Sequence, residues 1–71
     1  MKALIRTPFG VVKPGMRILI EKMDNTGGRD WQADEYNGKS GTVRFIDDEG
    51  YIHGDWGGLS VNPQIDKFKI I

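Results

Sequence analysis

Cysteine is absent from this 71-residue sequence, and several other features that would point to a function are scarce. Without cysteine the chain has no disulfide, no thiolate ligand for zinc and no thiol nucleophile, which fits a reducing compartment. The first apolar run, residues 3–5, is interrupted by Arg6 and is far too short for a signal peptide or a membrane span. We therefore expect a cytoplasmic protein, without a membrane partner, whose fold depends on packing alone.

An excess of charge of either sign is also missing, because ten Lys and Arg balance ten Asp and Glu. A net charge of zero gives the molecule as a whole no attraction for phosphate backbones or anionic membranes. The distribution is uneven, since residues 1–22 are mainly basic and residues 23–58 mainly acidic. Nucleic acid stays open as a partner, but the charge does not favour it.

Histidine occurs once, at position 53, between a tyrosine and an aspartate. A general base or a zinc site at His53 would need help from the carboxylates at residues 47–49, and one histidine without cysteine rarely builds either site. Residues 24–35 have the length of an EF-hand loop, but Gly28 and Arg29 stand where that loop needs an oxygen donor and a glycine. We expect no enzyme, no catalytic residue, no metal and no cofactor.

Ten glycines and three prolines leave no stretch long enough for a three-turn amphipathic helix. Apolar and polar residues instead alternate with the period of a strand in five short segments, at residues 16–23, 41–46, 51–56, 59–62 and 67–71. A long polar loop follows the first segment, and one short 3-10 turn fits before the last. The sequence predicts an all-β fold, a small five-stranded SH3-like barrel over residues 13–71, with residues 1–12 as an N-terminal arm or edge strand.

The alternation also predicts the core. On the strand at residues 41–46, Val43 and Phe45 share the inner face, while Ile46 lies on the outer face with Thr42 and Arg44. The inward positions of all the segments together are Ile18, Ile20, Val43, Phe45, Ile52, Trp56, Leu59, Val61, Ile65, Phe68 and Ile70. We expect Trp56 and Phe68 to be largely buried.

Trp31 and Tyr36 lie among acidic residues in the long loop. Aromatic rings in such a setting form a site for a cationic or proline-rich peptide, or they fold back to cover an open end of the barrel. The acidic and aromatic signature of eukaryotic SH3 domains is absent, so the sequence does not support proline-rich peptides. A candidate binding surface for a protein partner consists of Trp31, Tyr36, Asp47, Asp48, Tyr51 and His53.

Residues 37–43, NGKSGTV, look like the Gly-x-x-Gly-x-Val pattern of KOW-type modules, small barrels that bind RNA or ribosomal and transcription proteins. A simpler interpretation is that Gly38 and Gly41 allow the chain to bend where a strand begins. The pattern supports an alternative function, a KOW-like nucleic-acid-associated barrel. Its basic residues would be Lys2, Arg6, Lys13 and Arg17.

Three longer motifs resemble a family of small bacterial and phage domains, catalogued as a domain of unknown function, number 4314. They are KPGMRI at residues 13–18, SGTVRFIDDEGYIHGDWGG at residues 40–58, and NPQIDKF at residues 62–68. The resemblance implies a small stand-alone barrel of bacterial, phage or mobile-element origin, and it brings no activity or catalytic residue. The loop at residues 27–40 is longer than the proline-bearing loop expected for the family. We expect a non-enzymatic binding or adaptor module for a protein partner, as a monomer or a homo-oligomer.

Overall fold

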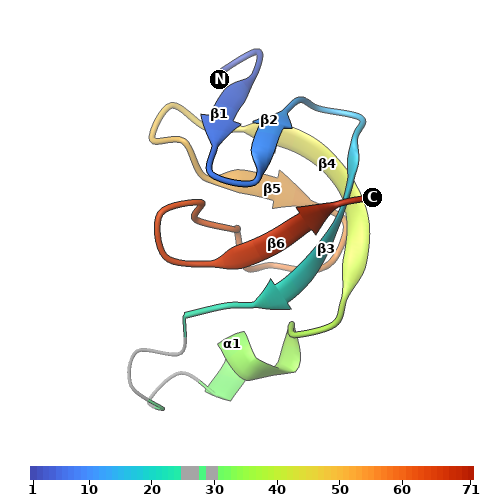
Figure 1. Cartoon of the computed structure of the whole chain (residues 1–71), viewed down its shortest axis with the longest axis vertical. Coiled ribbons are helices and arrows are strands. Elements are labelled where there is room, and N and C mark those ends of the chain that lie inside the picture. Colours follow the sequence, from blue (N-terminus) through green and yellow to red (C-terminus); the bar gives the residue numbers. More distant parts are fainter. Residues whose placement is uncertain (25–27, 29–30) are drawn as a thin grey trace.

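The computed structural model describes residues 1–24, 28 and 31–71, without the side chains of Trp31 and Gln32 (Figure 1). Strands dominate it, so the all-β class is confirmed. In chain order the elements are β1 (Ile5–Thr7), β2 (Gly10–Val12), β3 (Arg17–Lys22), α1 (Trp31–Glu35), β4 (Ser40–Ile46), β5 (Ile52–Gly54) and β6 (Lys67–Ile70).

The strands form two antiparallel sheets. Four of them make a sheet in the order β5-β4-β3-β6, and β1 and β2 pair as a separate hairpin. The prediction of five strands therefore has to be corrected to six, and the described strands do not close into a single barrel. The hairpin and α1 lie at opposite ends of a molecule 32 Å long (Figure 1).

Residues 1–12, expected to be an arm or an edge strand, are attached to the rest at several points. Lys2 forms an isolated antiparallel bridge with Ile46 at the end of β4. Val12, at the end of the hairpin, is fully buried in the same core as β3 and β4. The hairpin thus contributes to the core as well as to the edge.

A bulge in β4 overturns one core assignment. Val43 pairs with Gly54 but Phe45 pairs with His53, so Arg44 is an extra residue on its strand. An extra residue reverses the alternation beyond it, and Ile46 is therefore fully buried whereas Phe45 is only partly covered. The prediction that Phe45 enters the core is wrong for this reason.

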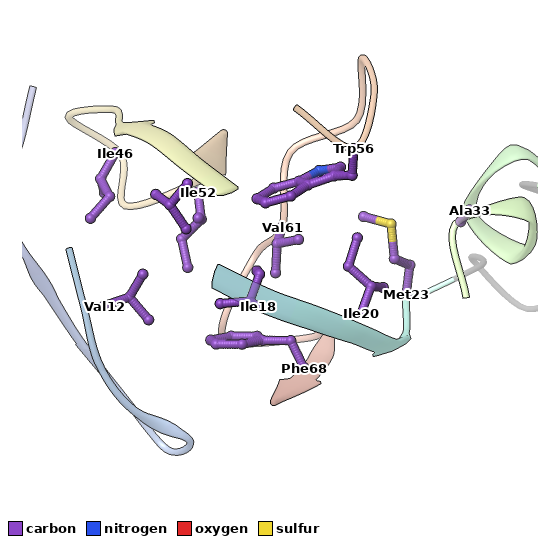
Figure 2. Close-up of a cluster of buried hydrophobic side chains, with 11 residues drawn as sticks. Val12, Ile18, Ile20, Met23, Ala33, Ile46, Ile52, Trp56, Val61 and Phe68 are labelled. Carbon is purple, nitrogen blue, oxygen red and sulfur yellow. The ribbon is translucent and has the colours of Figure 1, made fainter. Parts of the chain in front are cut away.

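Most of the remaining core agrees with the prediction. Trp56 is 6% exposed and Phe68 is fully buried, and Figure 2 shows Val61 and Ile18 between their rings. Leu59 and Ile70 pack against the core only partly buried. Ile65, expected inside, is 58% exposed. Besides Ile46, three hydrophobic residues of the core were not foreseen, namely Val12, Met23 and Ala33.

The segments between the strands differ from their predicted structure more than the strands do. The predicted long loop contains the short helix α1, and the segment at residues 59–62 forms only a bridge between Val61 and Ile52. Before β6 there is a single turn, in which the amides of Ile65 and Asp66 both donate to the carbonyl of Asn62. In the part of the chain that the structure describes, no helix has the length and the apolar character needed to cross a membrane.

Candidate functional site: a groove along the turn before β6

Three shallow hollows follow one another along the turn at residues 62–66, and we call them together the turn groove. The first, of about 270 Å³, lies between the β1–β2 hairpin, the β4–β5 turn and Pro63. The second, of about 260 Å³, shares Tyr51 and Asn62 with the first and extends to Ala33 of α1. The third, of about 210 Å³, shares Ile65 with the second. The shared residues place the three hollows next to one another along the turn.

A buried carboxylate fixes the floor of this groove. Asp66 is 5% exposed, and its Oδ1 accepts a hydrogen bond from the amide of Asp24 at 2.6 Å. Its Oδ2 accepts one from the amide of Asn62 at 2.7 Å. A buried carboxylate is tolerated when such charge-assisted bonds satisfy it. Asp66 therefore ties the segment after β3 to both ends of the turn.

Several polar groups in the groove are open to a ligand. The hydroxyl of Tyr51, the guanidinium of Arg6 and the side-chain amide nitrogen of Asn62 make no hydrogen bond to another described residue. Beside them stand the apolar surfaces of Pro8 and Pro63. Apolar walls with a few convergent polar groups are typical of binding sites.

The β4–β5 turn next to the groove is held by Asp47. Its Oδ1 accepts hydrogen bonds from the amides of Glu49 at 3.0 Å and Tyr51 at 2.9 Å. Its Oδ2 lies 2.8 Å from Nε2 of His53, whose ring stacks on Phe45 with the ring centroids 4.3 Å apart. The hydrogen bond from His53 is the main cause that lowers the pKa of Asp47, followed by the bond from the Tyr51 amide. Asp47 thus fixes the backbone that positions Tyr51.

We expect this carboxylate to make stability depend on pH in acid. The folded pKa of Asp47 lies below its ordinary value of 3.8, so its ionised form stabilises the fold above that value, and the contribution is lost as the pH falls through the folded pKa. Asp47→Asn should therefore be less stable than the wild type at neutral pH, and the difference should shrink as the pH falls below 3.8.

Urea denaturation at a series of pH values measures this difference. Glu35→Gln is the control, because it removes an exposed carboxylate that takes part in no described ion pair. A difference between Asp47→Asn and the wild type that stays constant from neutral pH into acid would contradict the assigned role of Asp47.

Tyr36 covers the end of the core near α1. It is half-buried, and its hydroxyl accepts a hydrogen bond from the amide of Gly58 at 3.1 Å. The Nζ of Lys39 lies 4.8 Å from the centroid of its ring. These contacts fit the covering interpretation for Tyr36. The covering role was also considered for Trp31, but the side chain of Trp31 lies outside the described residues.

The structure distributes the six candidate residues over different places. Tyr36 lies beside α1, whereas Asp47, Asp48 and His53 belong to the β4–β5 region at the other end of the sheet (Figure 1). The amino group of Met1 binds the carboxylate of Asp48, and this contact lowers the pKa of Asp48. Among the residues that the structure describes, no three His, Asp or Glu side chains are grouped as metal ligands would be.

Of the five candidates whose side chains the structure describes, only Tyr51 lines the turn groove. Asn62 and Ile65 were not among the predicted site residues, and Arg6 was predicted only as part of a basic N-terminus. A usable signal was present for the turn, because an Asn-Pro pair between two strand-like segments marks a turn. No local signal shows that Arg6 and Tyr51 approach that turn.

Comparison with known proteins adds no relative to this picture. No family model, no curated protein and no solved structure matches the chain. The features that bear on function are therefore the turn groove and the distribution of charge.

Proposed function

We propose that this protein is a non-enzymatic binding module that holds an extended segment of a partner protein in the turn groove. The observation that carries the proposal is the position of Ile65, which is 58% exposed at the place where two of the three hollows meet. An exposed isoleucine beside a concave surface is the kind of apolar anchor that dominates protein interfaces.

The polar groups of the groove suit an extended peptide. Such a peptide carries a backbone carbonyl at every residue, and the Tyr51 hydroxyl, the Asn62 amide and Arg6 are all donors that lack a described partner. The exposed ring of Pro8 provides apolar contact beside them, and the buried Pro63 backs the same hollow. Main-chain hydrogen bonds combined with apolar pockets are the usual means of binding extended segments.

The proposal includes an SH3-like barrel as the fold and membership of a family of small bacterial and phage domains. For the SH3-like plan, the support is that four strands, β3 to β6, and the isolated bridge at Val61 follow one another in the expected chain order, with the hairpin β1–β2 as an addition. The motifs at residues 13–18, 40–58 and 62–68 support membership of the small-domain family of bacteria and phages. The last motif contains Asp66, which fixes the floor of the groove.

We expect Ile65→Ser to weaken peptide binding without weakening the fold. Peptides selected from a random displayed library on the immobilised wild-type protein are the probes, and fluorescence anisotropy measures their Kd. Loss of an apolar anchor costs more than about 1 kcal/mol, or about fivefold in Kd. Leu4→Ser is the matched control, since Leu4 is 42% exposed and lines none of the three hollows.

The comparison of the two variants shows whether the peptides bind in the turn groove or elsewhere on the surface. Equal affinity of the wild type and Ile65→Ser for every selected peptide would contradict the proposal, as would an equal loss in Leu4→Ser. Failure of the library to yield any peptide with a measurable Kd would also count against it. The midpoint of urea unfolding, measured for each variant, shows that the variants compared are folded.

A further inference from the structure

We infer that the outer face of the four-stranded sheet binds the phosphodiester backbone of a nucleic acid. This inference does not rest on the peptide groove, with which the residues that carry it share only Lys67. The cationic residues that carry it are defined below as the outer sheet face.

The pairing of the strands shows which residues share this face. Ile18, Ile20, Val43 and Phe68 are buried, and side chains alternate between the two faces of a sheet. The residues next to Ile18 on β3 and next to Phe68 on β6 therefore lie on the opposite face, and Arg44, the extra residue of the bulge in β4, is exposed as well. The outer sheet face consists of Arg17 on β3, Arg44 on β4, and Lys67 and Lys69 on β6.

These cations have no counter-charge from the protein. The described ion pairs are Met1–Asp48 and His53–Asp47, and neither includes a residue of the outer sheet face. Lys67 is moreover the direct cross-strand partner of Lys22, although like charges in that position destabilise a sheet. Most acidic residues are elsewhere, at residues 47–49 in the β4–β5 turn and at residues 34–35 in α1, and Glu21 on β3 is the acidic residue beside the cations of this sheet. The net charge is zero, but the positive and negative side chains are thus concentrated in different places on the surface.

The composition of the face favours nucleic acid over protein as the occupant. Interfaces between proteins are depleted of lysine and rely on apolar anchors, whereas interfaces with nucleic acid are strongly positive and polar. On this face β3 contributes one apolar residue, the half-buried Leu19, which pairs with Lys69 and Ser40. The set of residues also differs from the one that the basic N-terminus suggested, since only Arg17 is common to both.

The test measures binding of a fluorescein-labelled oligothymidylate of about 12 nucleotides, within the length that one small β-domain covers. A duplex of the same length is measured beside it, to tell single strands from double strands as the source of the backbone. If about four phosphates of the single strand are contacted, affinity should fall about 50-fold between about 50 and 200 mM salt.

Lys69→Gln/Arg44→Gln removes two cations of the outer sheet face, neither of which lines the turn groove. We expect its affinity to fall only about 7-fold over the same salt range, because two phosphate contacts remain. Lys2→Gln/Lys13→Gln is the matched control, with the same change in net charge at exposed residues off this face. Its salt dependence should equal that of the wild type.

Three results would overturn the inference. They are no binding of either oligonucleotide at low salt, an equal reduction of the salt dependence in both double variants, and binding to phosphatidylserine vesicles without binding to oligonucleotides. Circular dichroism and thermal unfolding of both variants establish that they are folded. Because the groove residues are intact in all of these proteins, the result is separable from that of the peptide experiment.

Discussion

Replacing Gly54 by alanine is expected to destabilise the protein by about 3 kcal/mol, at the upper end of the usual cost of overpacking a core. A Cβ atom at position 54 would lie 2.2 Å from Cζ3 of Trp56 and 2.6 Å from the carbonyl oxygen of Thr42. Neither neighbour gives way easily. The indole Nε1 of Trp56 donates to the carbonyl of Leu59 at 2.7 Å, and Thr42 belongs to the adjacent strand β4.

The control for this prediction is Gly58→Ala, because a Cβ atom at position 58 meets nothing within 4 Å. Its amide can still donate to the hydroxyl of Tyr36. Urea denaturation should therefore place Gly58→Ala close to the wild type and Gly54→Ala far below it. Similar midpoints for the two variants would show that Trp56 does not occupy the described position.

Removing the carboxylate of Asp66 should have an effect of similar size. Asp66→Ala leaves the amides of Asp24 and Asn62 without their acceptor, and each buried donor left unsatisfied costs about 1–3 kcal/mol. We expect a loss of about 4 kcal/mol. A domain of this length has a total stability of only about 4–10 kcal/mol, so Asp66→Ala should lose at least about two-fifths of it.

Two further variants provide the comparison for Asp66→Ala. Asp66→Asn retains an oxygen acceptor for one of the two amides, and we expect it to lose about half as much stability. Glu21→Ala, which removes an exposed carboxylate at the end of β3, should change stability by less than about 0.5 kcal/mol. If calorimetry or urea denaturation shows Asp66→Ala to be as stable as Glu21→Ala, the proposed role of Asp66 in the groove is wrong.

The alternating pattern was sufficient for the parts of the fold that rest on a regular strand. Ile18 and Ile20 on β3 and Phe68 on β6 were placed correctly, because these residues lie in the regular part of the pairing, before the irregularity between Ile20 and Lys22. The pattern failed at Phe45 and Ile46, since a bulge is defined by pairing with β5 and leaves no mark in the alternation of β4 itself. It failed at Ile65 because residues in a turn do not follow the period of a strand.

The candidate site could be foreseen only in part, for a related reason. Tyr51 was named from its aromatic ring beside the acidic turn. The groove, however, is formed where three segments meet that are distant in sequence, and Arg6, Tyr51 and Asn62 come from different ones. Local propensities contain no information about such a meeting. The separation of charge onto the outer sheet face is likewise a property of strand pairing, because Arg17, Arg44 and Lys69 are not neighbours in the sequence.

The position of β3 between β4 and β6 has a consequence for how the protein folds. Strand β6 follows β3 in the chain only after α1, β4 and β5, so Ile18 and Ile20 meet Phe68 through a contact that closes a long loop. Non-local pairing of this kind slows folding toward the range of milliseconds to seconds. During synthesis on the ribosome, strand β3 has one of its two edges unpaired until β6 has emerged. The chain therefore depends, for that interval, on its many charged residues and short strands to avoid aggregation.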